Sequence, residues 1–234
     1  MIASVNAPDK KSWSDNLHTE VRYWEFIISG RHANADRVRA FRERASGQYS
    51  FPSQLKKYLR PERTTRILDV GAGPHTVIGT RDVPTPIHIV AIDPLAREYD
   101  TLLEQNGITP KIRTVTGEAE KLSSYQFGTF DLVYSRNALD HSYDPVAAIE
   151  AMRSVLNPDG FIFLEGSVNE GQKQKYHGLH RWNFQPEADG DLIVWSQLSR
   201  ISLREKYPEA TINAIRQDQW YKVELSFPSN REDD

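Results

Sequence analysis

The chain has 234 residues, a formal net charge of −3 and a mean hydropathy of −0.60. This length predicts one large domain or a domain with an appended cap. The absence of cysteine excludes disulfides, thiolate metal sites and a cysteine nucleophile, and the slightly acidic charge offers no basic field to nucleic acid. Because no run approaches about 18 apolar residues and the N-terminus has no apolar leader, we expect a soluble, cytoplasmic protein that does not insert into membranes.

The first part of the chain has the pattern of a helical segment. In EVRYWEFIISG (20–30), apolar residues recur at helical intervals up to a terminal glycine. A charged helix over 35–47 and a short helix over 51–59 are predicted next. These helices carry too few apolar residues to form a core without the rest of the chain. We therefore predict that residues 1–63 form a helical N-terminal cap or lid on a domain that spans 64–234.

Beyond residue 66, short apolar strands alternate with helices. The two clearest helices, 94–107 and 144–160, begin with Pro94 and with Asp144 as an N-cap, and each ends at a glycine. Such alternation is typical of a parallel sheet with right-handed crossovers and helices on both faces. The predicted strands span 66–70, 87–92, 111–116, 130–135 and 160–166.

The C-terminal segment departs from this alternation. A helix is predicted over 198–208, followed by two strands, 211–217 and 221–227. Only three residues separate these strands, too few for a parallel crossover, so they must form a hairpin and the last strand must run antiparallel. The sequence thus predicts an α/β fold with a Rossmann-like, doubly wound sheet of seven strands, parallel except for the last.

The first predicted strand runs into the stretch RILDVGAGPHTVIG (66–79). Gly71 and Gly73 fit a glycine-rich turn of the kind that cradles a pyrophosphate, but Thr76 occupies the third glycine position. In addition, Pro74 removes a backbone N–H donor, and Asp69 places a negative charge where phosphates would approach. The turn is better suited to a cofactor with a cationic amino group and no phosphate, such as S-adenosylmethionine (SAM).

The next two strand ends carry further carboxylates. Asp93 ends the second strand, where this type of fold places an acceptor for both ribose hydroxyls. Glu118 follows the third strand, in a position to accept from an adenine amino group. Because ligands of open α/β sheets bind outside the carboxyl ends of the strands, we expect Asp69, Asp93 and Glu118 to form one continuous cleft edge.

These residues carry a resemblance to a known family. The motifs DVGAGP, IDP, GEAE, FDLVYSRNALDH and RSVLNPDGFIFLEG resemble those of class I SAM-dependent methyltransferases that act on small molecules, over about residues 66–227, and the sheet of that family also ends in an antiparallel hairpin. The resemblance implies SAM as cofactor and S-adenosylhomocysteine as product. It also implies which residues bind the cofactor: Asp69, Gly71 and Gly73 at the methionine end, Asp93 at the ribose, Leu95, Glu118 and Ala119 at the adenine, and Ser135 to Asn137 in the methyl-donor pocket. Relatives often carry aspartate where this chain has Glu118.

Histidines follow the fourth and fifth strands. His141 is a candidate general base because its near-neutral pKa suits proton transfer at physiological pH, and Asp140 beside it would orient the imidazole. The alternative is a histidine that orders the start of the next helix. The stretch QKYHGLHRWNF (174–184) adds His180, which we expect to face the transferable methyl group from the wall opposite His141. Its alternative is a structural flap filled by aromatic side chains.

A metal centre is not assigned from the sequence. It would need His141, His177, His180 and Asp140 to converge, and no H-E-x-x-H or comparable spacing supports that.

The function that the sequence favours is methyl transfer from SAM to an oxygen or nitrogen of a polar small molecule, sugar or glycan precursor. A non-catalytic SAM-binding module that senses the cofactor or supports a partner enzyme is the alternative. The missing third glycine and the antiparallel last strand argue against a nicotinamide-dependent oxidoreductase. The acceptor, the atom that is methylated and the oligomeric state stay open.

Overall fold

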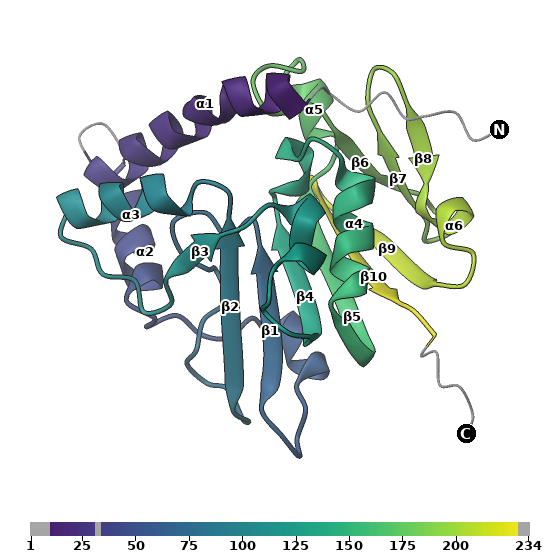
Figure 1. The fold of residues 1–234 in the computed structure, drawn as a ribbon, viewed down its shortest axis with the longest axis horizontal. Helices are drawn as coiled ribbons and strands as arrows, with labels where there is room; N and C mark the ends of the chain where they lie inside the picture. The colour runs from purple at the N-terminus through teal and green to yellow at the C-terminus, as the bar shows by residue number, and fades with distance from the viewer. Residues whose placement is uncertain (1–9, 31–33, 229–234) are drawn as a thin grey trace.

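The computed structural model describes residues 10–30 and 34–228. Seven strands form the main sheet in the order β3-β2-β1-β4-β5-β10-β9 (Figure 1). The neighbouring pairs from β3 to β5 are parallel, whereas β10 is antiparallel to both β5 and β9. This arrangement confirms the predicted Rossmann-like sheet and its closing hairpin. The strands are β1 (Thr65–Val70), β2 (Ile87–Asp93), β3 (Thr114–Thr116), β4 (Phe130–Arg136), β5 (Leu156–Ser167), β9 (Thr211–Gln217) and β10 (Trp220–Ser226).

The helices lie at the positions that the sequence predicts for most of the chain. The N-cap of α4 is Asp144, whose carboxylate accepts hydrogen bonds from the N–H groups of Val146 and Ala147. Residues 71–86, between β1 and β2, form a loop without a helix. The helices are α1 (Lys10–Ser29), α2 (Ala35–Ala45), α3 (Ala96–Gln105), α4 (Pro145–Ser154), α5 (Glu170–Lys173) and α6 (Leu203–Lys206), with 3-10 helices η1 (Ser53–Tyr58), η2 (Ala119–Ser124) and η3 (Leu139–His141). No described helix combines the length and apolar character that crossing a bilayer requires.

A second, three-stranded antiparallel sheet follows β5 and was not predicted. It consists of β6 (Asn183–Pro186), β7 (Leu192–Trp195) and β8 (Arg200–Ser202). The helix predicted over 198–208 is wrong for most of its length: its first part forms β8, and only the four-residue α6 is helical. Ser202 caps α6 by accepting from the N–H of Glu205. Apolar residues of this small sheet, such as Val194, join the main core.

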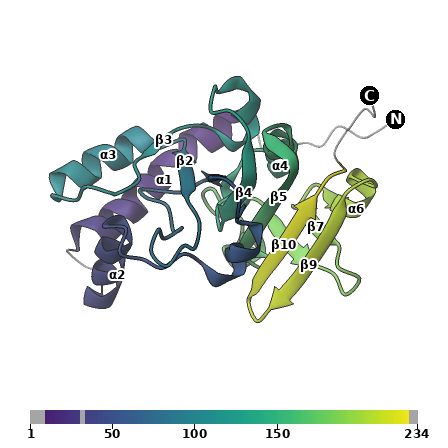
Figure 2. The same ribbon diagram turned by 90° about the horizontal axis from the view of Figure 1, so that it is seen from below.

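Helices α1 and α2 do not have a core of their own. Buried residues of α1 and α2, including Ile28 and Phe41, pack in one cluster with Tyr99 and Leu103 of α3. Figure 1 shows α1 lying across the end of the sheet, and Figure 2 shows α1, α2 and α3 on one side of the molecule with β9 and β10 on the other. The N-terminal helices therefore cover the edge at which the parallel strands end.

Candidate functional site

A cavity of about 520 Å³ lies at the carboxyl ends of the parallel strands, under α1. Its walls come from α1, the loop after β1, the ends of β2 and β4, the loop after β3, and the segment after β5. Most of the site residues predicted from the sequence line it: Asp69, Gly71, Gly73, Asp93, Leu95, Glu118, Ala119, Asn137, His141 and His180. The structure thus brings together residues that lie up to 111 positions apart. Asp69, Asp93 and Glu118, which we expect to form one cleft edge, all line this cavity.

Asp69, at the end of β1, is held by the residue that replaces the third glycine. The hydroxyl of Thr76 donates to Oδ2 of Asp69 at 2.5 Å and accepts from the N–H of Ile78. Burial raises the pKa of Asp69 to about 7, and the negative charge of Asp93 adds to this effect. A buried carboxylate of this kind is stabilised in its ionised form when a cation binds beside it.

The glycines allow the loop to approach its neighbours closely. Gly71 has φ +71°, and a Cβ atom there would lie 2.4 Å from the Cβ of Ala138. Gly73 has φ +65°, and a Cβ would lie 3.1 Å from the indole of Trp24. Any larger residue at Gly71 would therefore clash with the loop after β4.

Asp93, at the end of β2, has two backbone partners. Its Oδ2 accepts from the N–H of Gly73 at 3.0 Å, and its Oδ1 accepts from the N–H of Leu95 at 2.9 Å. Burial raises the pKa of Asp93 to about 6. The carboxylate thus fixes the loop after β1 and the start of α3, in addition to lining the cavity.

Glu118 is already paired. It accepts from Nζ of Lys10 at 2.7 Å, from Nζ of Lys121 at 2.9 Å and from the hydroxyl of Tyr143 at 3.1 Å. Burial raises the pKa of Glu118, but these partners, with Lys10 foremost, lower it below its usual value. Because Lys10 belongs to α1, Glu118 joins the cap to the adenine side of the predicted cleft.

Glu120, in the first turn of η2, is a half-buried carboxylate. Its Oε1 accepts from the N–H groups of Tyr143 at 2.9 Å and of Asp144 at 3.2 Å. Burial raises the pKa of Glu120 to about 7. It therefore holds the start of α4 against η2.

Of the predicted site residues Ser135 and Asn137, at the end of β4, only Asn137 lines the cavity. Ser135 does not line the cavity, because its hydroxyl donates to the carbonyl of Val70 at 2.9 Å and so ties β4 to β1. Ser135 is therefore not in the methyl-donor pocket, as the resemblance implied, but has a structural role between two strands. Asn137 does line the cavity, with φ 49° and its side-chain oxygen accepting from the N–H of Ser167. This contact fixes the loop after β4 against β5.

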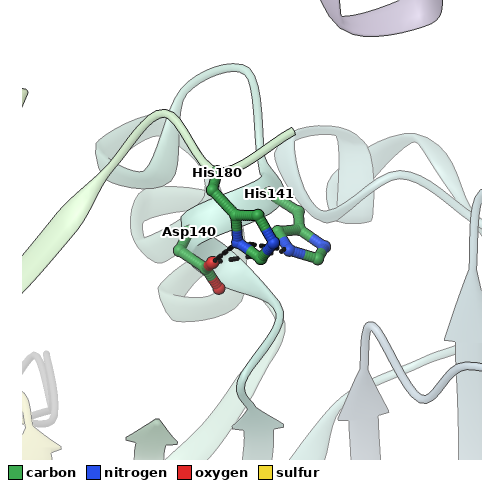
Figure 3. Close-up of side chains that lie close together, drawn as sticks. All are labelled: Asp140, His141 and His180. Carbon is green, nitrogen blue, oxygen red and sulfur yellow. Dashed lines mark hydrogen bonds and ion pairs between the residues drawn. The ribbon is translucent and has the colours of Figure 1, made fainter. Parts of the chain in front are cut away.

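Asp140, His141 and His180 form one cluster. Oδ2 of Asp140 lies 2.8 Å from Nδ1 of His180 and 3.4 Å from Nε2 of His141, and the two ring nitrogens are 2.9 Å apart. Figure 3 shows the three side chains pointing toward one another. The prediction that the imidazoles come from opposite walls is wrong, because the segment after β5 folds back onto η3: the N–H of Arg181 donates to the carbonyl of Asp140.

Within the cluster, the carboxylate of Asp140 and the neighbouring imidazoles stabilise each other's charged forms. Burial raises the pKa of Asp140, but the neighbouring His141 and His180 lower it below the usual range of an aspartate. Burial lowers the pKa of His180, but the hydrogen bond with Asp140 raises it above its ordinary value. Outside the cluster, Oε2 of Glu20 on α1 lies 3.7 Å from Nδ1 of His141.

The aromatic stretch 174–184 divides into two parts. His180 lines the cavity, whereas Trp182 and Phe184 are buried in the main core. His177 is exposed and is not part of the cavity wall. The alternative of a structural flap filled by aromatic side chains therefore describes Trp182 and Phe184, whereas a role of His180 toward the methyl group stays a prediction.

Several residues of the cavity wall are not identified as site residues by any sequence motif. Trp13 and Trp24 come from α1, and Arg44 comes from α2. Nε of Arg44 and Nε2 of His75 are buried and have no hydrogen-bond partner among the described residues. Burial lowers the pKa of His75 to about 4, so its imidazole is neutral near pH 7. Both residues belong to the cavity wall, although these two atoms themselves are buried behind it.

Comparison with known proteins is consistent with this geometry. Residues 68–164 match the family model of the methyltransferase domain. The chain is 28% identical over 167 residues to an uncharacterized methyltransferase of Schizosaccharomyces pombe, covering 67% of this chain and 55% of that protein. It is 32% identical over 118 residues to an uncharacterized methyltransferase of Mycobacterium tuberculosis, covering 50% of this chain and 46% of that protein. The chain thus spans about half the length of these curated relatives.

Among solved structures, DhpI in complex with SAH has a TM-score of 0.51. The match covers 93% of this chain and 99% of that chain at 13% sequence identity. At this identity the likeness shows the fold alone, and it agrees with the family that the sequence motifs indicate.

Proposed function

We propose that this chain, a member of the class I SAM-dependent methyltransferases, transfers a methyl group from SAM to an oxygen or nitrogen of a polar small molecule, sugar or glycan precursor. The observation that carries the proposal is the pair of buried carboxylates, Asp69 and Asp93, at adjacent strand ends of one cavity. Both have raised pKa values, so a cationic ligand would restore favourable interactions to their ionised forms.

The residues present fit the cofactor. Asp69 and the glycine loop would hold its amino-acid end, Asp93 its ribose, and Leu95 with Ala119 its adenine. Arg44 adds a cationic side chain to the wall of the same cavity. When bound, SAM supplies a methyl group that is already activated by the sulfonium. The chain then has to align the nucleophile, exclude water and manage the nucleophile's proton.

We assign the acceptor's proton to the cluster of Asp140, His141 and His180. An imidazole is a suitable base near neutral pH, and both rings line the cavity. Asp140 is a positioning residue in this proposal, because it is 4% exposed and contacts the rings rather than the cavity. Glu20 and Gln174 add polar groups to the nearby wall, which supports a polar acceptor.

The direct test is to incubate the protein with methyl-labelled SAM and a panel of nucleotide sugars and metabolites. We expect a product that gains one methyl group, together with S-adenosylhomocysteine. Calorimetry should show that SAM binds far more tightly than NAD, because Asp69 disfavours a pyrophosphate and Pro74 lacks a donor for it. Tighter binding of NAD would contradict the proposal. SAM binding with no product from any acceptor would favour the non-catalytic binding module.

We also propose that residues 1–63 are not an independent domain and that their first helix, α1, acts as a lid, while Leu55 and Tyr58 of η1 pack in the core beside β1 and β4. The only buried residues of α1 are Ile27 and Ile28, at its C-terminal end. Its N-terminal part meets the sheet domain through exposed or partly exposed contacts, such as Lys10 with Glu118 and Trp13 with Tyr143. Helix α1 should therefore open from its N-terminal end about an anchor near Ile28.

Hydrogen exchange should detect this motion. Amides in the first half of α1 should exchange faster than those of β1 and β4, and SAM should slow them. Amides of α3, on the fixed side of the anchor, provide the comparison. Equal protection of α1 and the sheet, unchanged by SAM, would count against a lid.

A further inference from the structure

One nitrogen or oxygen atom from each of Asp140, His141 and His180 lies close to the other two, so that the three atoms form a triangle and not a line. In a linear proton relay, the middle imidazole contacts its two neighbours through different ring nitrogens. Here one atom, Nδ1 of His180, lies 2.8 Å from Oδ2 of Asp140 and 2.9 Å from Nε2 of His141. The third side of the triangle, from Asp140 to His141, is 3.4 Å. The three ligand atoms therefore point at one region of space (Figure 3).

We propose that Asp140, His141 and His180 bind a divalent transition-metal ion of the zinc type. Two imidazole nitrogens and one carboxylate oxygen form a donor set that zinc and its neighbours prefer. Ligand distances of about 2.0–2.2 Å place tetrahedral ligand atoms roughly 3.4 Å apart, so only the two shorter separations have to widen, by about half an ångström. The sequence predicted no metal centre because the convergence depends on folding.

The surroundings of the cluster match those of a metal site. If Nε2 of His141 binds the ion, its Nδ1–H faces Oε2 of Glu20 at 3.7 Å, and such a carboxylate orients a ligating imidazole. The carboxylates of Glu20 and Glu170 also act electrostatically on His180, and both line the cavity. The local charge is therefore negative, which favours a cation.

The site has three protein ligands and faces the cavity, a pattern typical of catalytic rather than structural zinc. A fourth position toward the cavity can take water or an oxygen of the acceptor. This second step rests on the proposed function but assigns the proton differently: imidazole nitrogens bound to the ion cannot accept it, whereas a metal-bound hydroxyl has a lowered pKa and would release its proton to water. The binding of the ion itself does not depend on methyl transfer.

The test is a metal titration of the full chain after chelator treatment, without SAM or acceptor. Zinc binding is followed by calorimetry, and cobalt binding by its visible absorption. We expect one ion per chain at micromolar concentration, with absorption typical of tetrahedral cobalt. The variants His141→Ala, His180→Ala and Asp140→Asn should each weaken zinc binding by at least about tenfold. His177→Ala is the matched control, because this exposed histidine of the same segment lies outside the cluster.

Unchanged SAM affinity and circular dichroism would show that the variants are folded. The proposal is overturned if the parent protein binds no zinc at micromolar concentration, or if the three variants bind it as tightly as the His177 control. Either result stands even if labelled methyl groups are transferred. Conversely, specific zinc binding with no methyl transfer would support the metal site and count against the proposed function.

Discussion

Replacing His141 with alanine should lower methyl transfer to the true acceptor by about 10²–10⁴-fold, the usual effect of losing a positioned general base. The affinity for SAM should stay within a few-fold, because the predicted cofactor contacts come from the ends of β1, β2 and β3. The same loss is expected if the cluster holds a metal ion, since His141 would then be a ligand. Turnover is measured with saturating SAM, and SAM affinity by calorimetry.

Two further variants sharpen the result. His180→Ala should fall in the same range, because His180 contacts both Asp140 and His141. His177→Ala should retain full activity. If His141→Ala transfers methyl groups at the parent's rate, the cluster has no role in proton removal, and methyl transfer would then depend on proximity and orientation alone.

Replacing Asp93 with asparagine should weaken SAM binding by roughly 1–3 kcal/mol, and should weaken folding by a similar amount near pH 4, where the parent's carboxyl still contributes to stability. The amide keeps one acceptor oxygen, but its NH₂ group cannot accept from the second of the two N–H groups, those of Gly73 and Leu95, that the carboxylate holds. Denaturant unfolding and SAM calorimetry report the two effects separately. Asp100→Asn is the control: this carboxylate pairs with exposed Arg113 at the surface, where ion pairs contribute little.

The pH dependence of SAM binding adds a check on the Asp93 prediction. Because the folded pKa of Asp93, about 6, lies above its unfolded value of about 3.9, its contribution to stability is fully present below about pH 4 and is lost as pH rises through 6. Cation binding has the opposite sign, since it needs the ionised forms. SAM affinity should therefore fall from about pH 8 to 5 as Asp69 and Asp93 take up protons, and less steeply in Asp93→Asn. Equal slopes would remove Asp93 from the site.

The sequence predicts the main sheet because its signals are local. Apolar runs, helix caps and the short connection between β9 and β10 each depend on a few neighbouring residues. The small sheet of β6, β7 and β8 escapes this reasoning. Its last strand and α6 share a stretch whose spacing suits a helix, and the backbone of Ile201 becomes a strand only because it pairs with Val194 of β7.

The location of some residues of the candidate site likewise follows from local sequence signals, and that of others does not. Asp69, Asp93 and Glu118 follow predicted strands, and parallel strands end at one edge, so their common location follows from the sequence. The convergence of His141 and His180 does not, because 39 positions separate them and no fixed spacing links a loop to a flap. The contribution of Trp24 and Arg44 depends on how α1 and α2 pack on the sheet domain, which no local pattern specifies.

One face of α1 supplies much of the cavity wall that the strand ends do not. Trp13, Leu17, Glu20 and Trp24 line the cavity at alternating helical intervals of four and three residues. Trp24 also lies against the glycine loop, at Gly73. Glu20 lies 3.7 Å from His141, and Trp13 packs on Tyr143, so changes at these two positions would also disturb the predicted site. A directed-evolution library for new acceptors would therefore best begin at Leu17, where the helix lines the chamber with an apolar side chain.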